Sequence, residues 1–120
     1  MSDYTVNPKF ITKSDAYIVD EIKKVLIEKG SFFGLGQSKE YKVVSITASF
    51  FKYKGENKTA QNPEAISFES IMATLPLLKS QSRFNVNSNT LKLKMSRDVY
   101  RQRTALFAIL VAANIIIVKE

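Results

Sequence analysis

Apolar residues follow two different spacings along this chain, and the spacing distinguishes predicted helices from predicted strands. Between residues 14 and 29 the apolar side chains recur at helical intervals, at Ile18, Ile22, Val25 and Leu26. Ser14 supplies an N-cap before them, and Gly30 supplies a C-cap after them. The pattern therefore predicts an amphipathic helix over Ser14–Lys29 with one buried face.

The segment Tyr41–Lys54 alternates instead and is rich in β-branched and aromatic residues, which is typical of a strand. It is long enough to contain a bend. One face is expected to enter the core because it is mainly apolar, and it consists of Val44, Ile46, Ala48 and Phe50. The opposite face, which carries Phe51 and Tyr53 among hydroxyl-bearing residues, is expected to lie in solvent.

The C-terminal third of the chain predicts a strand, a helix and a second strand. Thr90–Ser96 alternates cleanly, with apolar side chains at Leu91, Leu93 and Met95. Ser96 can then cap a helix over Arg97–Ala113, whose second half is almost wholly apolar. Asn114 is expected to end this helix, and Ile115–Val118 is expected to be a buried strand.

The other stretches are less regular. Residues 1–12 are expected to form an N-terminal arm, and residues 13–120 a single domain. The glycine-containing stretch 31–40 is expected to be a connecting loop. The middle of the chain is ambiguous, and there we expect a short strand near Ala65–Phe68 and then a helical segment that ends before Pro76.

Taken together, these segments predict an α+β fold in which two principal helices pack on a mainly antiparallel sheet. The helices are Ser14–Lys29 and Arg97–Ala113. The sheet is expected to contain Tyr41–Lys54, Thr90–Ser96 and Ile115–Val118. A chain of 120 residues is long enough to build one hydrophobic core of this kind.

The composition narrows the possible chemistry. The chain contains no cysteine and no histidine, which removes disulfides, thiol chemistry, and the commonest general base and metal ligand. The acidic residues are isolated, and the one nuclease-like pair, Glu21 with Lys23, falls in the first predicted helix, where the two side chains diverge by about 200°. We therefore expect a non-enzymatic protein that holds no cofactor and no metal.

The balance of charge favours a polyanionic partner. Eighteen Lys and Arg residues against eleven Asp and Glu residues give a formal net charge of +7, and such a surplus attracts nucleic acid, phosphate or an anionic surface. A soluble surface that repels its own copies is the plainer alternative. The apolar tail from 105 to 118 is shorter than the ~20 residues of a spanning helix. We therefore expect no membrane partner and a cytoplasmic location, or one inside a virion or other assembly.

The candidate site is the predicted solvent face of Tyr41–Lys54. Phe51 and Tyr53 would stack on bases, and lysines would contact phosphates, namely Lys52, Lys54, Lys58, Lys92 and Lys94. The last two lysines reach this site only if Thr90–Ser96 lies beside the first strand. The sequence thus predicts a module that binds nucleic acid, DNA or RNA, in a single-stranded form and with weak sequence preference.

An alternative from another class is a structural or assembly protein, such as a virion component or another homo-oligomer. In that interpretation the aromatic face of Tyr41–Lys54 is covered, either by Phe10 or Phe32 and Phe33 of the same chain or by a second subunit at an interface between proteins. The basic residues then touch a polyanion only incidentally. The mass of the purified protein in solution distinguishes the two hypotheses, because an assembly protein forms a large symmetric particle.

Overall fold

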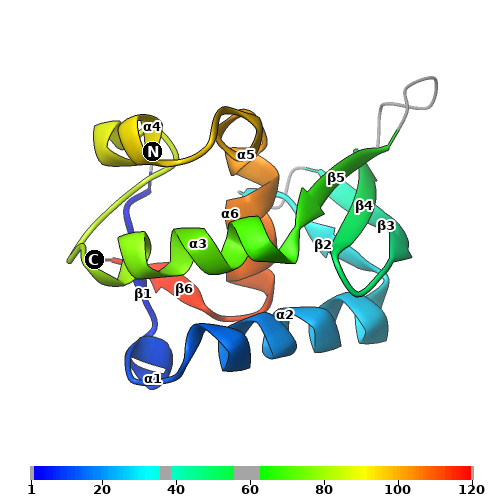
Figure 1. Ribbon diagram of the computed structural model, residues 1–120, viewed down its shortest axis with the longest axis horizontal. Helices are drawn as coiled ribbons and strands as arrows, with labels where there is room; N and C mark the ends of the chain where they lie inside the picture. Colours follow the sequence, from blue (N-terminus) through cyan, green and yellow to red (C-terminus); the bar gives the residue numbers. More distant parts are fainter. Residues whose placement is uncertain (1, 36–38, 56–62, 120) are drawn as a thin grey trace.

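The computed structural model describes residues 2–35, 39–55 and 63–119, and these ranges form helices packed against two antiparallel sheets (Figure 1). The strands are β1 (Tyr4–Val6), β2 (Ser31–Phe33), β3 (Glu40–Ile46), β4 (Phe50–Gly55), β5 (Glu64–Ser67) and β6 (Ile116–Val118). The helices are α1 (Pro8–Ile11), α2 (Asp15–Lys29), α3 (Phe68–Lys79), α4 (Asn89–Lys94), α5 (Arg97–Arg101) and α6 (Arg103–Ala112). The predicted α+β fold with a mainly antiparallel sheet is therefore confirmed.

The strands β2, β3, β4 and β5 form one antiparallel sheet in which each strand pairs with the next along the chain. The segment predicted as one bent strand is a hairpin of β3 and β4. The hydroxyl of Thr47 accepts hydrogen bonds from the backbone N–H groups of Ser49 and Phe50, which closes the turn between them. The stretch 31–40, predicted to be a loop, supplies β2 and the start of β3 instead, because the buried ring of Phe32 anchors it as an edge strand.

The helices α2, α3 and α6 pack against the sheet (Figure 1). The predicted limits of α2 are confirmed. Ser14 accepts a hydrogen bond from the N–H of Tyr17 at 3.1 Å, and Gly30 ends the helix in the left-handed conformation, with φ of 64°. The buried side chains of α2 fall on one face and are Ile18, Val19, Ile22 and Leu26.

The helix α3 continues through Pro76, where the sequence predicted an end. Proline lacks the N–H that would bond the carbonyl of Met72. Both residues are exposed, so water can satisfy that carbonyl. Leu75 and Leu78 are buried on the other side of the helix and hold it to the core.

The predicted strand Thr90–Ser96 is wrong, because this segment contains the helix α4. Ser88 turns the chain ahead of it: its hydroxyl accepts from the N–H of Asn85 at 2.8 Å, and its carbonyl accepts from the N–H of Leu91 at 3.1 Å. Leu91 is buried, but Leu93 is 75% exposed. The alternating leucines therefore share no core face, and a single leucine anchors a short surface helix.

The predicted helix Arg97–Ala113 is divided at Gln102 into α5 and α6. Asn114 ends α6 as predicted and adopts a left-handed conformation with φ of 63°. Every residue from Ala105 to Leu110 is buried, so this apolar stretch belongs to the core, as predicted. Within the described ranges, no helix combines the length and the apolar character needed to cross a membrane.

The strand β6 pairs with β1 and, contrary to the prediction, does not join the larger sheet. Tyr4 lies opposite Val118 in this pair, and a backbone bridge connects Tyr4 to Phe84 on its other side. The expected arm, residues 1–12, contributes both β1 and the buried ring of Phe10 to the packed body. The two ends of the chain therefore meet in one small sheet.

Candidate functional site

Phe51 and Tyr53 lie on the inner face of the sheet, so the prediction that they face solvent is wrong. Their side chains are only 0% and 5% exposed. They belong to an aromatic cluster with Phe32, Tyr41 and Phe68, in which neighbouring ring centroids are 5.2 to 6.3 Å apart. Rings from β2, β3, β4 and α3 meet on this face, whereas the opposite face of β4 carries one aromatic ring and two lysines. Neither Phe51 nor Tyr53 is available to stack on a base.

The Tyr53 hydroxyl is held in a buried polar network. It donates to Oε1 of Gln102 at 2.7 Å, and Nε2 of Gln102 donates to the carbonyl of Ala65 on β5 at 3.0 Å. Burial raises the pKa of Tyr53 well above its usual 10, and nearby Glu64 adds to the effect. Tyr53 is therefore a neutral donor that ties the sheet to the junction of α5 and α6 at Gln102.

The other side of the sheet, here called the outer sheet face, is open to solvent in the described part of the chain. Its central residues are Lys42 on β3 and Phe50, Lys52 and Lys54 on β4. Lys42 and Lys52 are exposed, while Phe50 and Lys54 are partly buried. The ammonium of Lys52 lies over the ring of Phe50, with Nζ 5.8 Å from its centroid. This face thus combines a partly buried aromatic ring with a group of lysines.

Lys42 and Lys54 occupy directly opposed positions on the paired strands β3 and β4. Like charges placed opposite one another in a sheet repel and lower its stability. Among the residues that the structure places, no carboxylate forms an ion pair with either lysine or with Lys52. An anion such as a phosphate would relieve the repulsion by neutralising both charges.

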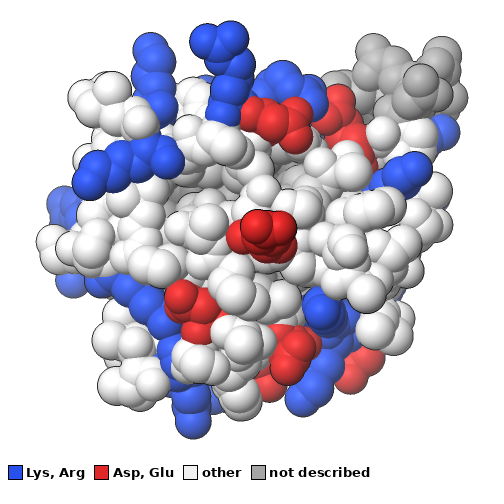
Figure 2. Space-filling model, viewed as in Figure 1, with Lys and Arg blue, Asp and Glu red and all other residues white. Residues whose placement is uncertain are grey.

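The structure does not gather the five predicted lysines into one site. Lys92 and Lys94 are on α4, and α4 and β4 lie toward opposite ends of the long axis of the molecule (Figure 1). Lys58 lies outside the described residues. Basic side chains also project around α4 and α5 (Figure 2), but there Arg101 is neutralised by two carboxylates at 2.9 and 3.2 Å. Of the predicted set, only Lys52 and Lys54 remain together beside an aromatic ring of the outer sheet face, the partly buried Phe50.

Phe50 and Lys42 are the site residues that sequence reasoning missed. A signal for them was present, because Lys42, Lys52 and Lys54 share the alternation of Phe50. Three lysines on one face of a strand favour solvent for that face, and the two aromatic residues on the other face, Phe51 and Tyr53, favour the core.

The remaining candidate chemistry in the described ranges is a metal site and the pair of Glu21 and Lys23. No three or more Asp, Glu, His or Cys side chains come together there to hold a metal ion. Glu21 and Lys23 are both on α2, but Glu21 pairs with Lys24 at 3.5 Å. Lys23 lies over the ring of Phe68, with Nζ 4.7 Å from its centroid. The nuclease-like pair therefore has separate partners.

Comparison with known protein families, curated proteins and solved structures finds no match for this chain. The functional argument therefore depends on the site itself. Within the described residues, the outer sheet face brings an aromatic ring together with three lysines that form no ion pair.

Proposed function

We propose that this chain is a non-enzymatic module that binds nucleic acid, in a single-stranded form and with weak sequence preference, through the outer sheet face. Lys42, Lys52 and Lys54 contact phosphates, and Phe50 stacks on a base. Phe33, which is 58% exposed on the same face of β2, extends the aromatic surface toward the edge of the sheet.

The observation that carries this proposal is the directly opposed pair of Lys42 and Lys54. In the free protein this arrangement is unfavourable, since no carboxylate within the described residues forms an ion pair with either lysine. A bound phosphate turns the repulsion between the two lysines into attraction of both to the phosphate, and binding releases counterions from the nucleic acid. A base stacked on Phe50 would add about 1–3 kcal/mol.

The test compares two double variants that remove the same charge from different places. K42Q/K54Q changes the outer sheet face, whereas K92Q/K94Q changes α4, and each removes two positive charges from a formal net charge of +7. Labelled single-stranded DNA and RNA are titrated with each variant at two salt concentrations. We expect K42Q/K54Q to flatten the logarithmic salt dependence by about 1.4, or roughly 0.7 for each lost phosphate contact. K92Q/K94Q should leave the slope nearly unchanged.

Phe50→Ala tests the stacking contact separately. It should weaken binding while keeping the salt slope of the wild type, because stacking releases no counterions.

Two outcomes would contradict the proposal. If K42Q/K54Q and K92Q/K94Q lower the affinity and the salt slope equally, the binding is only the attraction that any basic protein shows. A dissociation constant weaker than about 100 μM at physiological salt would mean the same. The assembly alternative then takes its place, and a large symmetric particle in solution would support it.

A further inference from the structure

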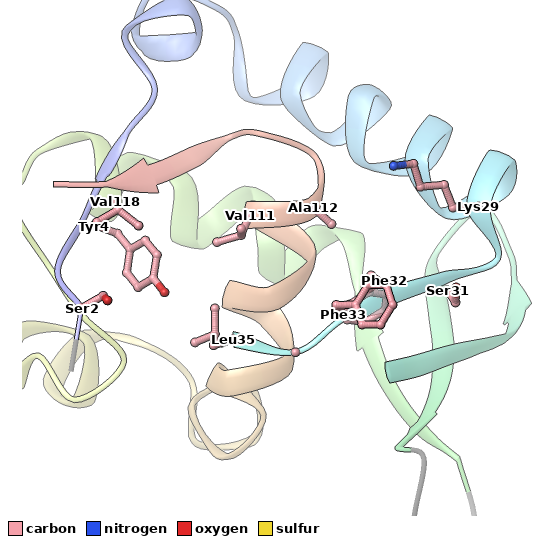
Figure 3. Close-up of a pocket in the computed structure, with 11 residues that line it drawn as sticks. Ser2, Tyr4, Lys29, Ser31, Phe32, Phe33, Leu35, Val111, Ala112 and Val118 are labelled. Atoms are coloured by element: carbon pink, nitrogen blue, oxygen red, sulfur yellow. The ribbon is translucent and has the colours of Figure 1, made fainter. Parts of the chain in front are cut away.

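A cavity of about 640 Å³ lies among β2, the end of α6 and the paired strands β1 and β6 (Figure 3). Its apolar wall is formed by Phe32, Phe33, Leu35, Val111 and Ala112. Small-molecule sites typically have volumes of about 300–1,000 Å³, apolar walls and a few polar groups that fix the orientation of the ligand. This cavity has the size and the wall of such a site.

The first polar group of the cavity is the hydroxyl of Tyr4. The side chain is only 8% exposed, and its ring packs edge-on against Phe107 with centroids 5.9 Å apart. Figure 3 shows the hydroxyl directed toward the space between Leu35 and Val111. It makes no hydrogen bond within the part of the chain that the structure describes. The hydroxyl is therefore free to donate a hydrogen bond to an atom of a ligand.

The second polar group is the ammonium of Lys29, at the other end of the cavity (Figure 3). It forms no ion pair with the described residues. It is also the only charged side chain among the described residues that line the cavity. A ligand that complements this cavity is therefore anionic at the Lys29 end, apolar in the middle and a hydrogen-bond acceptor at the Tyr4 end.

We infer that the cavity binds an amphipathic carboxylate with a flexible apolar chain, placing its carboxylate beside Lys29 and a terminal hydrogen-bond acceptor beside Tyr4. The chain of the ligand lies against Val111, Ala112 and Leu35. The lysines of the outer sheet face do not line the cavity, and Phe33 is the residue that borders both sites.

A tryptophan reporter makes the binding measurable, because the chain contains no tryptophan of its own. Phe33→Trp places the indole at the rim of the cavity, where the native ring is 58% exposed and tolerates a larger one. Circular dichroism verifies that each variant is folded. The reporter is titrated with octanoate, dodecanoate and hexadecanoate, each below its critical micelle concentration, and with dodecyltrimethylammonium as the cationic control.

We expect a saturable change in emission with at least one carboxylate and none with the cationic amphiphile. A terminal hydroxyl on the best carboxylate should tighten binding about fivefold through a hydrogen bond to Tyr4. Tyr4→Phe in the reporter background should remove that preference and retain binding of the plain carboxylate. Lys29→Gln should weaken binding about threefold, as expected for an exposed ion pair. Lys24→Gln, on the same helix but outside the cavity, should have no effect.

Ala112→Phe provides the decisive variant because it fills the cavity from the wall of α6 and should abolish the response. If the folded A112F reporter still binds, the ligand lies elsewhere and the inference is overturned. The same conclusion follows if no carboxylate gives a saturable response, if the cationic amphiphile binds equally, or if Lys24→Gln and Lys29→Gln weaken binding alike. If Tyr4→Phe unfolds the chain, the comparison of Lys29→Gln with Lys24→Gln and the A112F variant still test the inference.

Discussion

Phe50 and Phe51 are adjacent in the chain and have opposite surroundings. Phe51 is buried beneath the sheet, with its ring centroid 5.9 Å from that of Phe68, whereas Phe50 lies on the outer sheet face beneath Lys52. Successive side chains of a strand point to opposite faces, so one ring of such a pair has to leave the core. Here one ring holds the sheet to α3, and the other lies on the outer sheet face.

The different surroundings of the two rings predict different effects on stability when each ring is replaced by alanine. Phe51→Ala is expected to lower the free energy of unfolding by about 3–5 kcal/mol, because it removes a buried ring and leaves a cavity. Phe50→Ala is the matched control on the neighbouring residue and should lower it by less than about 1 kcal/mol. Urea unfolding followed by circular dichroism measures both values. If the two variants lose similar free energies of unfolding, the assignment of Phe51 to the core and of Phe50 to the outer sheet face is contradicted.

The buried hydroxyl of Tyr53 predicts a loss of stability in alkali. Burial raises the pKa of Tyr53 in the folded chain above the value near 10 of an exposed tyrosine. Above about pH 10 the unfolded chain loses a proton that the folded chain retains, so the free energy of unfolding decreases as the pH rises. Tyr53→Phe removes this titration, and its stability should decline less steeply from about pH 9 to 11.

The same variant should also be less stable at neutral pH by about 1–3 kcal/mol, because Oε1 of Gln102 loses its buried donor. Denaturant unfolding at several pH values gives both quantities in one series. If the free energy of unfolding falls equally steeply with pH in the wild type and in Tyr53→Phe, another group controls the alkaline transition, such as the partly buried Tyr41.

At the scale of elements, prediction succeeded where the signals are local. The limits of α2 follow from Ser14 and Gly30, which lie at its own ends. The helix α4 was missed because a short alternating segment fits a strand or a surface helix equally well, and only the burial of Leu91 distinguishes them. The buried contacts of Gln102, where the helix breaks, could not be predicted either, since its partners Tyr53 and Ala65 come from distant strands.

The strand β6 is expected to be essential for the fold. Deleting residues 115–120 removes Ile115 and Ile116, which are 0% and 1% exposed, and leaves β1 without its partner. The shortened chain should be insoluble or lose cooperative unfolding. Deleting only residues 119 and 120 is the control. It removes one described hydrogen bond, from the N–H of Lys119 to the carbonyl of Asp3 at 2.8 Å, and should leave the thermal midpoint nearly unchanged. A chain ending at Asn114 that melts like the wild type would contradict the role of β6.

At the scale of the whole molecule, the positive charge divides into separate groups. The net charge of +7 follows from composition alone, but its placement depends on which segments become neighbours. The alternation of β4 already places Lys52 and Lys54 on the side of Phe50, so part of the candidate site could be predicted. Which side faces water depends on rings contributed by β2 and α3, and a single strand does not contain that information.

The pairing of β1 with β6 also determines the order in which the chain can fold. The larger sheet joins strands that follow one another in sequence, whereas Tyr4 meets Val118 only after almost the whole chain has been drawn into a loop. The entropy lost in closing a loop grows with its length, and contacts between distant residues form slowly. The terminal sheet should therefore form last. Until it does, the apolar strand Ile116–Val118 is unpaired, so the slowest step of folding is also the one at which copies of the chain are most prone to aggregate.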